Sequence, residues 1–199
     1  MSPIRALCLH GYHGSAQILR RQIAPLAAGL STDIDLDFVD APSRATGDFG
    51  WWHDGFAGWE RSIGWVVDLL AHRRYDGIFG FSQGAALAGL LAAAREDGRL
   101  GQLDFQFAIM VGGFTSTLPQ HADLFARRLT LPSLHVTGRL DGVVPMRDSL
   151  QLADRFANPL ILRHPGGHVI PGDAELTARI DEFITKRGSV TTVAGEAHD

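Results

Sequence analysis

The stretch GIFGFSQGAALAGLLAA, residues 77–93, joins a short apolar run to a longer run rich in alanine and leucine. The residues GIFGF have the length and composition of a strand that is covered on both faces. The alanine-rich residues that follow predict a helix that packs closely on its neighbours. Between them lies Gly80-Phe81-Ser82-Gln83-Gly84, which matches the pattern G-x-S-x-G. The stretch therefore predicts a strand, a tight turn that carries a serine, and a helix.

The residue types around Ser82 fit a serine whose hydroxyl is exposed above the end of a sheet. The turn is so tight that a side chain at position 80 or 84 would collide with neighbouring backbone. The N–H groups at the start of the helix favour negative charge at the serine. The pattern alone is a weak signal, but a serine that only caps a helix would not need a glycine on each side. We therefore predict that Ser82 is a nucleophile.

Short apolar runs alternate with helical patterns along the rest of the chain. Strands are predicted at Arg5–Leu9, Asp33–Val39, Gly77–Phe81, Phe105–Val111, Ser133–Thr137 and Leu160–Arg163. Helices are predicted at Ser15–Ala28, Gly58–Arg73, Gln83–Asp97, Met146–Phe156 and Ala174–Lys186. This alternation predicts an α/β fold, with a mostly parallel six-stranded sheet and helices on both faces. One domain is expected over residues 1–187, followed by a flexible tail over residues 188–199.

Composition narrows the classes of function. The 199 residues carry a net charge of −4 without a basic patch, so nucleic acid is not an expected partner. No apolar run is long enough to span a membrane, and the first apolar segment is too short for a signal peptide. Cys8 is the only cysteine, which excludes an internal disulfide. We expect a cytoplasmic protein without a membrane partner, in which Cys8 is a buried structural residue.

A nucleophilic serine needs a base and an acid that orients the base. In hydrolases with this strand–turn–helix pattern, the acid and then the histidine follow the serine along the chain. Asp141 is the only acid in HVTGRLDGVVP, after the fifth predicted strand. RHPGGHVIP, after the sixth, offers His164 and His168. His168 is the predicted base because two glycines let its loop return over the sheet, whereas His164 lies at the strand end and is the alternative.

The segment LCLHGYHGS, residues 7–15, contains two histidines three positions apart. On a strand-to-loop turn this spacing does not place two rings on one helical face, and no third metal ligand follows by sequence. Acyl transfer instead needs N–H donors for a developing oxyanion. The expected donors are the backbone N–H groups of Gln83 and of Tyr12. His10 is then predicted to brace this loop through hydrogen bonds to backbone, and His13 to lie at the rim of a cleft.

Two irregular connections, Ala41–Ala57 and Gly112–Thr130, are expected to line the site because long ordered loops in α/β proteins often do so. Within the first connection, Arg44 and His53 are interpreted as solvated residues, with contact to a carboxylate or phosphate as the alternative. Residues interpreted as possible walls of an acyl pocket are Trp51, Trp52, Phe114, Val143 and Val144, with core packing as the alternative for the two tryptophans.

These motifs together resemble the small serine hydrolases of the FSH family, in the α/β-hydrolase superfamily. That family includes fungal esterases and thioesterases and an ovarian-cancer-associated hydrolase. The resemblance rests on LCLHGYHGS, RYDGIFGFSQGA, HVTGRLDGVVP and HPGGHVIP, and on a WW…W segment before a helix. It implies an α/β-hydrolase fold with Ser82 as nucleophile, Asp141 as acid and His168 as base. The connection Gly112–Thr130 is short for the family, and this departure predicts a minimal cap. It also implies hydrolysis of small-molecule carboxylic esters or thioesters through an acyl-enzyme, without a metal or an organic cofactor.

Two other classes of function stay open on the sequence alone. A non-catalytic ligand-binding or scaffold protein could use the same fold, because fold does not fix function. A metallohydrolase could use His10 and His13. The length of the acyl chain, the choice between ester and thioester, and the oligomeric state have no signal in the sequence.

Overall fold

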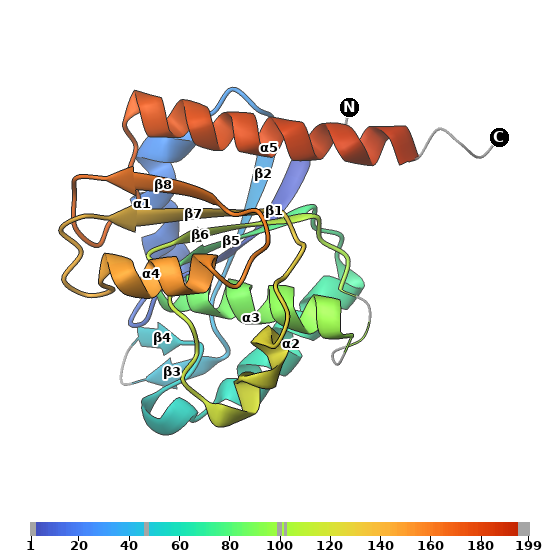
Figure 1. The fold of residues 1–199 in the computed structure, drawn as a ribbon, viewed down its shortest axis with the longest axis vertical. Coiled ribbons are helices and arrows are strands. Elements are labelled where there is room, and N and C mark those ends of the chain that lie inside the picture. The colour runs from blue at the N-terminus through green and yellow to red at the C-terminus, as the bar shows by residue number, and fades with distance from the viewer. Residues whose placement is uncertain (1–2, 46–47, 99–100, 102, 195–199) are drawn as a thin grey trace.

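Six parallel strands form one sheet through the middle of the molecule (Figure 1). The computed structural model describes residues 3–45, 48–98, 101 and 103–194. The strands lie in the order β2-β1-β5-β6-β7-β8, and every pairing between them is parallel. Their bounds are β1 Ile4–Leu9, β2 Ile34–Val39, β5 Gly77–Phe81, β6 Phe107–Val111, β7 Ser133–Gly138 and β8 Leu160–His164. The predicted six-stranded parallel sheet is confirmed.

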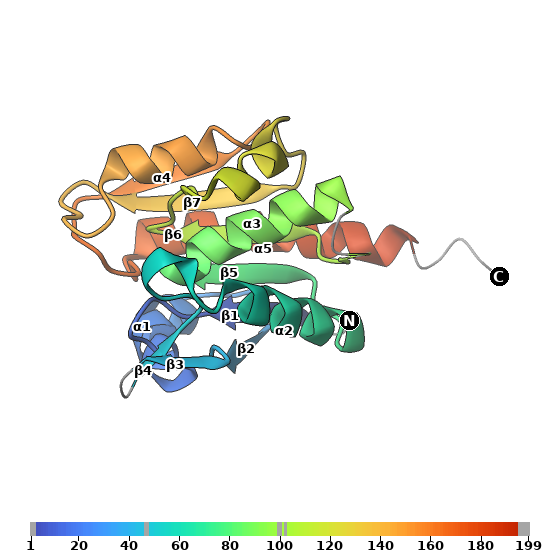
Figure 2. The same cartoon turned by 90° about the horizontal axis from the view of Figure 1, so that it is seen from below.

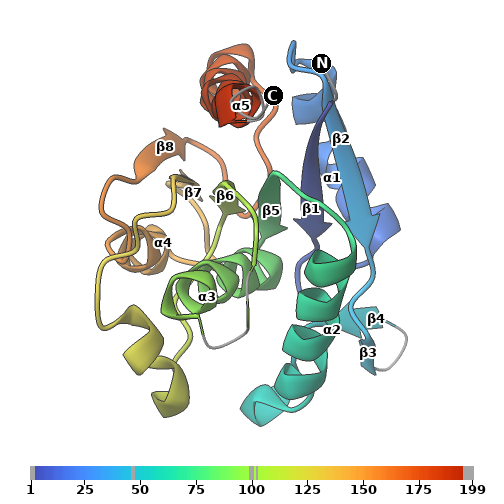
Figure 3. The same ribbon diagram turned by 90° about the vertical axis from the view of Figure 1, so that its right-hand side faces the viewer.

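Helices cover both faces of this sheet (Figure 3). α1 (Ala16–Ala28) and α5 (Ala174–Ala194) lie on one face. The other face carries α2 (Trp59–His72), α3 (Gln83–Asp97) and α4 (Met146–Ala153). Figure 2 shows α3 between α4 and α2 on that face. α3 is buried almost all round, which explains its small residues.

The sheet separates two hydrophobic cores, and the residues of each strand alternate between them. In β1, Leu7 and Leu9 face the core with α2 and α3, whereas Cys8 faces the core with α1 and α5. In β5, Ile78 joins the first core and Phe79 the second. Cys8 is a free, buried thiol, as predicted, and burial raises its pKa.

The order of the strands fixes where a site can form. β1 pairs with β2 on one side and with β5 on the other. The helix after β1 therefore goes to one face of the sheet, and the helix after β5 goes to the other. Ligands in open α/β sheets bind beyond the carboxyl ends of the strands at such a switch point. Here that crevice lies between the loop that follows Leu9 and the turn at Ser82.

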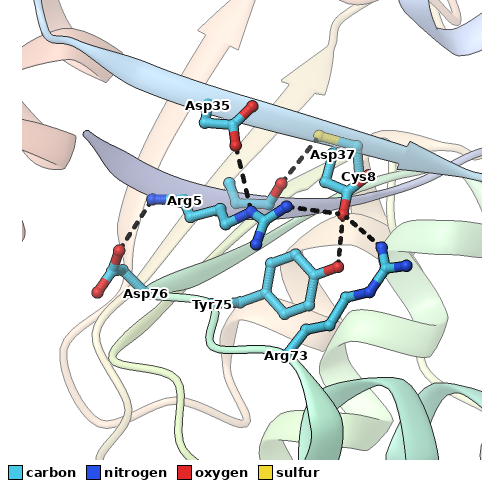
Figure 4. A network of polar contacts seen from close by, with 8 residues as sticks. Arg5, Cys8, Asp35, Asp37, Arg73, Tyr75 and Asp76 are labelled. Atoms are coloured by element: carbon cyan, nitrogen blue, oxygen red, sulfur yellow. Dashed lines mark hydrogen bonds and ion pairs between the residues drawn. The ribbon is translucent and has the colours of Figure 1, made fainter. Parts of the chain in front are cut away.

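A polar network lies at the amino-terminal ends of the strands, away from this crevice (Figure 4). The hydroxyl of Tyr75 donates to Asp37 of β2 at 2.6 Å, and Arg73 Nη1 lies 3.4 Å from the same carboxylate oxygen. Arg5 of β1 forms an ion pair with Asp35 at 3.2 Å. Burial and the bond to Asp37 raise the pKa of Tyr75 to about 12. The network joins β1, β2 and the residues that lead into β5.

Some element boundaries differ from the prediction. The irregular segment over residues 41–57 contains a short antiparallel hairpin, β3 (Ser43–Ala45) and β4 (Asp48–Gly50), and the 3-10 turn η1 (Asp54–Phe56). The β6–β7 connection contains the 3-10 turns η2 (Pro119–His121) and η3 (Asp123–Phe125). These small additions to the described part of the chain agree with a minimal cap.

The ends of two helices also differ from the prediction. α4 ends at Ala153, because the chain turns there so that Phe156 can bridge to Leu129. α5 ends at Ala194 rather than at Lys186. Residues 195–199 of the predicted tail lie outside the described residues, and the domain limits stay a prediction. Among the described residues, no helix is both long and apolar enough to cross a bilayer.

Candidate active site

The turn after β5 holds Ser82 in a strained backbone conformation. Its φ is 54° and its ψ is −117°, outside the regions that serine ordinarily adopts. The turn is tied to β6, since the N–H of Ser82 donates to the carbonyl of Val111 at 2.9 Å. Two further bonds of 3.0 Å run from the N–H groups of Ala85 and Ala86 to the Ser82 carbonyl. The neighbouring structure therefore holds the strained residue in place.

Both glycines that flank Ser82 are required by close backbone contacts. A Cβ on Gly80 would lie 2.4 Å from the carbonyl oxygen of Gly84. A Cβ on Gly84 would lie 2.1 Å from the carbonyl oxygen of Leu9. The second contact shows that the start of α3 lies directly against the end of β1. The predicted reason for the two glycines is confirmed.

Asp141 and His168 form a short hydrogen-bonded pair. Nδ1 of His168 lies 2.7 Å from Oδ2 of Asp141. The other carboxylate oxygen accepts from the N–H groups of Val143 and Val144, at 2.9 and 2.8 Å. The Asp141 side chain is 2% exposed and that of His168 is 16% exposed. The carboxylate is thus bonded on both oxygens, and it holds the ring with Nδ1 toward itself.

Two contacts place the His168 ring beside the turn at Ser82. The ring lies 4.8 Å, centroid to centroid, from that of Phe81, which immediately precedes Ser82. A Cβ built on Gly112 would lie 3.0 Å from Cε1 of His168, and Gly112 follows the residue that accepts the Ser82 N–H bond. The structure therefore brings Ser82, Asp141 and His168 to one edge of the sheet.

His164, the alternative base, lies within β8 and is buried. Burial lowers its pKa, and the charges of Asp141 and Asp173 oppose this effect. Its ring packs against the loop glycines, since Cβ atoms on Gly138 and Gly166 would both lie 3.1 Å from ring atoms. The hydrogen bond to Asp141 is made by His168.

The loop after β1 lies against the turn at Ser82. A Cβ on Gly11 would lie 3.2 Å from the Cβ of Ser82, so glycine permits this close approach. Tyr12 and Gln83 line the same cavity as Ser82. The two residues predicted to supply oxyanion donors thus flank the serine.

His10 braces this loop, as predicted. The ring is fully buried, Nδ1 lies 2.7 Å from the Gly11 carbonyl, and Nε2 accepts from the N–H of Ala41 at 3.0 Å. Burial lowers the pKa of His10. His13 is exposed, has a positive φ of 52° and packs its ring at 4.1 Å from that of Tyr12. Across the residues that the structure describes, no three His, Cys, Asp or Glu side chains are grouped as a metal site would need.

A cavity of about 580 Å³ opens at this edge of the sheet. Its wall is partly aromatic and partly polar, and its lining residues are Tyr12, Trp52, His53, Asp54, Ser82, Gln83, Phe114, Thr115, Thr117, Val143, Val144, Asp148 and Gln151. Of the predicted pocket residues, Trp52, Phe114, Val143 and Val144 line it. Val143 is 69% exposed and lies at the rim. Trp51 does not line the cavity, because its ring is fully buried in the core, which was the alternative interpretation.

Sequence reasoning missed several features of this site. His53, interpreted as solvated, lines the cavity, and its two shielded ring nitrogens have no hydrogen-bond partner among the described residues. The Arg44 side chain lies outside the described residues. The Gln83 side chain accepts from the N–H of Trp51 and donates to the carbonyl of Trp52, both at 2.8 Å. No local pattern signals that contact, because it spans some thirty residues of chain.

Comparison with known proteins agrees with this geometry. The family described as "Serine hydrolase (FSH1)" matches residues 1–180. The esterase OVCA2 of Danio rerio is 31% identical over 221 residues, which cover 92% of this chain and 97% of that protein. A dihydrofolate reductase of Schizosaccharomyces pombe is 28% identical over 216 residues, which cover 92% of this chain but only 47% of that protein.

The solved structures show the same fold. The acyl-protein thioesterase 2 of Zea mays superposes with a TM-score of 0.70 at 21% identity, and the match covers 94% of each chain. At this identity the likeness establishes the α/β-hydrolase fold, whereas the match over residues 1–180 establishes the family. This enzyme chain therefore belongs to the FSH1 family of serine hydrolases.

Proposed function

We propose that the protein hydrolyses carboxylic esters or thioesters through an acyl-enzyme formed on Ser82. The observation that carries this proposal is the strained serine beside a histidine whose Nδ1 is bonded to a buried carboxylate. A strained residue of this kind costs about 1–3 kcal/mol and persists at sites where function needs it. A non-catalytic binding or scaffold protein would have no need of that strain.

The first half-reaction transfers the acyl group to the enzyme. Nε2 of His168 takes the proton of the Ser82 hydroxyl as Oγ attacks the substrate carbonyl carbon. The bond from that carbon to the leaving oxygen or sulfur then breaks, and His168 returns the proton to the leaving group. Asp141 holds the neutral ring in the Nδ1–H tautomer and stabilises the imidazolium that forms.

The second half-reaction releases the acid. His168 takes a proton from a water molecule as the water oxygen attacks the carbonyl carbon of the acyl-enzyme. His168 then gives this proton to Ser82 Oγ as the bond between the acyl carbon and Oγ breaks. Both tetrahedral intermediates place a negative charge on the former carbonyl oxygen. The backbone N–H groups of Tyr12 and Gln83 are the proposed donors to that oxygen.

The cavity favours an uncharged, partly apolar substrate. Trp52 and Phe114 form an edge-to-face pair with centroids 6.4 Å apart on its wall. Among the described residues, its charged lining residues are Asp54 and Asp148, and neither lysine nor arginine belongs to the lining. An anionic acyl group would therefore meet two carboxylates on the described part of the wall.

A fluorophosphonate probe tests the nucleophile directly. We expect the probe to label folded protein on Ser82, as located by peptide mass spectrometry, and to leave Ser82→Ala unlabelled. p-Nitrophenyl esters of graded length, assayed beside acyl-coenzyme A thioesters, should show hydrolysis that falls close to background in Ser82→Ala. Labelling that persists in folded Ser82→Ala, or wild-type protein that neither labels nor hydrolyses any of these esters, would overturn the proposal.

A further inference from the structure

Three buried side chains connect the two proposed oxyanion donors. The Gln83 side chain holds both the N–H of Trp51 and the carbonyl of Trp52. The indole N–H of Trp51 donates to the carbonyl of His10 at 2.8 Å. The ring of His10 then reaches the carbonyl of Gly11 at 2.7 Å. Hydrogen bonds thus link the residues Gln83, Trp51 and His10, in that order, to the carbonyl of the Gly11–Tyr12 peptide.

The partners of His10 determine which ring nitrogen carries the proton. Nε2 faces the N–H of Ala41, which can only donate, so Nε2 must accept. Nδ1 therefore carries the hydrogen and donates to the carbonyl of Gly11. Burial lowers the pKa of His10 and keeps the ring in this neutral form. If the ring were protonated, the N–H at Nε2 would face the N–H of Ala41, and neither group could accept a hydrogen bond.

The Gly11 carbonyl and the Tyr12 N–H belong to the same peptide plane. No peptide in the described chain is cis, so the Tyr12 N–H points opposite to the Gly11 carbonyl. The His10 ring and the N–H of Gly14, at 3.1 Å, both donate to that carbonyl. Two donors fix the plane and polarise the amide, so that its N–H is a stronger donor on the side away from His10.

We infer that His10 is a positioning residue for the oxyanion site, and that Trp51 and the Gln83 side chain hold it in register with the nucleophile turn. The hydrogen bonds of Gln83, Trp51 and His10 together set the direction of the Tyr12 N–H relative to the N–H of Gln83. His10 itself touches no reacting atom. This inference rests on the proposed function, because the two amides act only if acyl transfer occurs at Ser82.

His10→Leu and His10→Asn form a matched pair of variants whose side chains have the same number and branching of heavy atoms. The leucine removes the donor, whereas the Asn amide nitrogen can occupy the position of Nδ1 and restore the bond to Gly11. Loss of an oriented oxyanion donor lowers kcat by about 100- to 1000-fold, so partial misorientation in His10→Leu should lower kcat by about 10- to 100-fold. KM should change little, since the ring does not line the cavity. His10→Asn should recover to within about fivefold of the wild-type kcat.

Two further variants separate positioning from packing. His135→Leu makes the same substitution at a buried histidine of β7 outside the cavity lining, and it should leave kcat unchanged. Trp51→Phe removes the indole N–H bond to His10 together with part of the buried ring, and it should lower kcat by about threefold to tenfold at constant KM. Near-ultraviolet circular dichroism confirms the fold of each variant. If His10→Leu does not fold, His10→Asn and Trp51→Phe still provide the test.

The outcomes separate this inference from the proposed function. Wild-type protein that neither labels with fluorophosphonate nor hydrolyses esters overturns the proposed function. Active wild-type enzyme with an unchanged kcat in folded His10→Leu, or with equal losses in the Leu and Asn variants, overturns the positioning role alone. Nitrogen-15 NMR of the histidine rings in Ser82→Ala, which needs no activity, should show His10 as the neutral Nδ1–H tautomer. The other tautomer would also overturn the inference.

Discussion

At the scale of single residues, Ser82 shows how strain and function are connected. Its φ of 54° and ψ of −117° are the mirror image of an ordinary extended conformation, which glycine adopts freely. Replacement by glycine should therefore relieve strain that replacement by alanine retains. The relief of roughly 1–3 kcal/mol is opposed by about 0.5–1 kcal/mol of extra backbone entropy in the unfolded chain.

We expect Ser82→Gly to be more stable than Ser82→Ala by about 1 kcal/mol, with both variants inactive. Urea unfolding at neutral pH measures the difference in the free energy of unfolding. Ala88→Gly, inside α3, is the control, because glycine in a regular helix should lower stability by about 1 kcal/mol. If the turn carried no strain, Ser82→Gly would instead be less stable than Ser82→Ala by about 0.5–1 kcal/mol, the cost of backbone entropy alone.

At the scale of elements, the sequence predicted the helices, strands and turns that depend on residues close together in the chain. The apolar runs that form β5 and β6 are buried on both faces, and the glycines of G-x-S-x-G are themselves the residues that make the tight turn possible. The hairpin of Ser43–Ala45 and Asp48–Gly50 was missed because three-residue strands are too short to show a period. A residue far away in the sequence holds the hairpin in place, because the N–H of Phe49 donates to the carbonyl of Gly14.

The cavity wall was predictable only where a residue adjoins a motif. Val143 and Val144 come two and three residues after Asp141, and Phe114 comes three residues after the end of β6, so their places could be inferred from the strand ends. Gln151 has no such signal, because only tertiary packing brings α4 to the cavity. The same limit applies to Trp51, whose sequence neighbours could not distinguish a core ring from a pocket ring.

The β6–β7 connection should determine how tightly substrate binds. Phe114 is half-buried against Trp52 on the cavity wall. We expect Phe114→Ala to raise KM for p-nitrophenyl butyrate by about tenfold with little change in kcat, since the ring supplies apolar contact and no chemistry. Steady-state kinetics measure this. The control is Phe38→Ala on β2, whose half-buried ring packs under Arg20 of α1, and it should leave KM unchanged. An unchanged KM in Phe114→Ala would exclude the connection from the binding wall.

At the scale of the whole molecule, buried neutral histidines connect stability to pH. His10, His121, His135 and His164 lie in different parts of the fold, and burial lowers the pKa of each. In the unfolded chain such rings gain a proton near pH 6.5, whereas in the folded protein they do so only at lower pH. Between these values the unfolded state binds more protons, so the free energy of unfolding decreases as pH falls.

His135 should contribute most to this loss. Burial lowers its pKa to about 3, so its stabilising effect is complete above pH 6.5 and is lost progressively as pH falls toward 3. Within that window, one proton of difference corresponds to about 1.4 kcal/mol per pH unit.

Urea unfolding between pH 7 and about pH 5 avoids the range in which aspartate and glutamate titrate. His135→Leu should show a shallower decline than wild-type protein by about 1.4 kcal/mol per pH unit below pH 6, and His72→Gln, at an exposed ring of α2, should retain the wild-type slope. Equal slopes in wild-type protein and His135→Leu would show that His135 does not drive the loss of stability in acid.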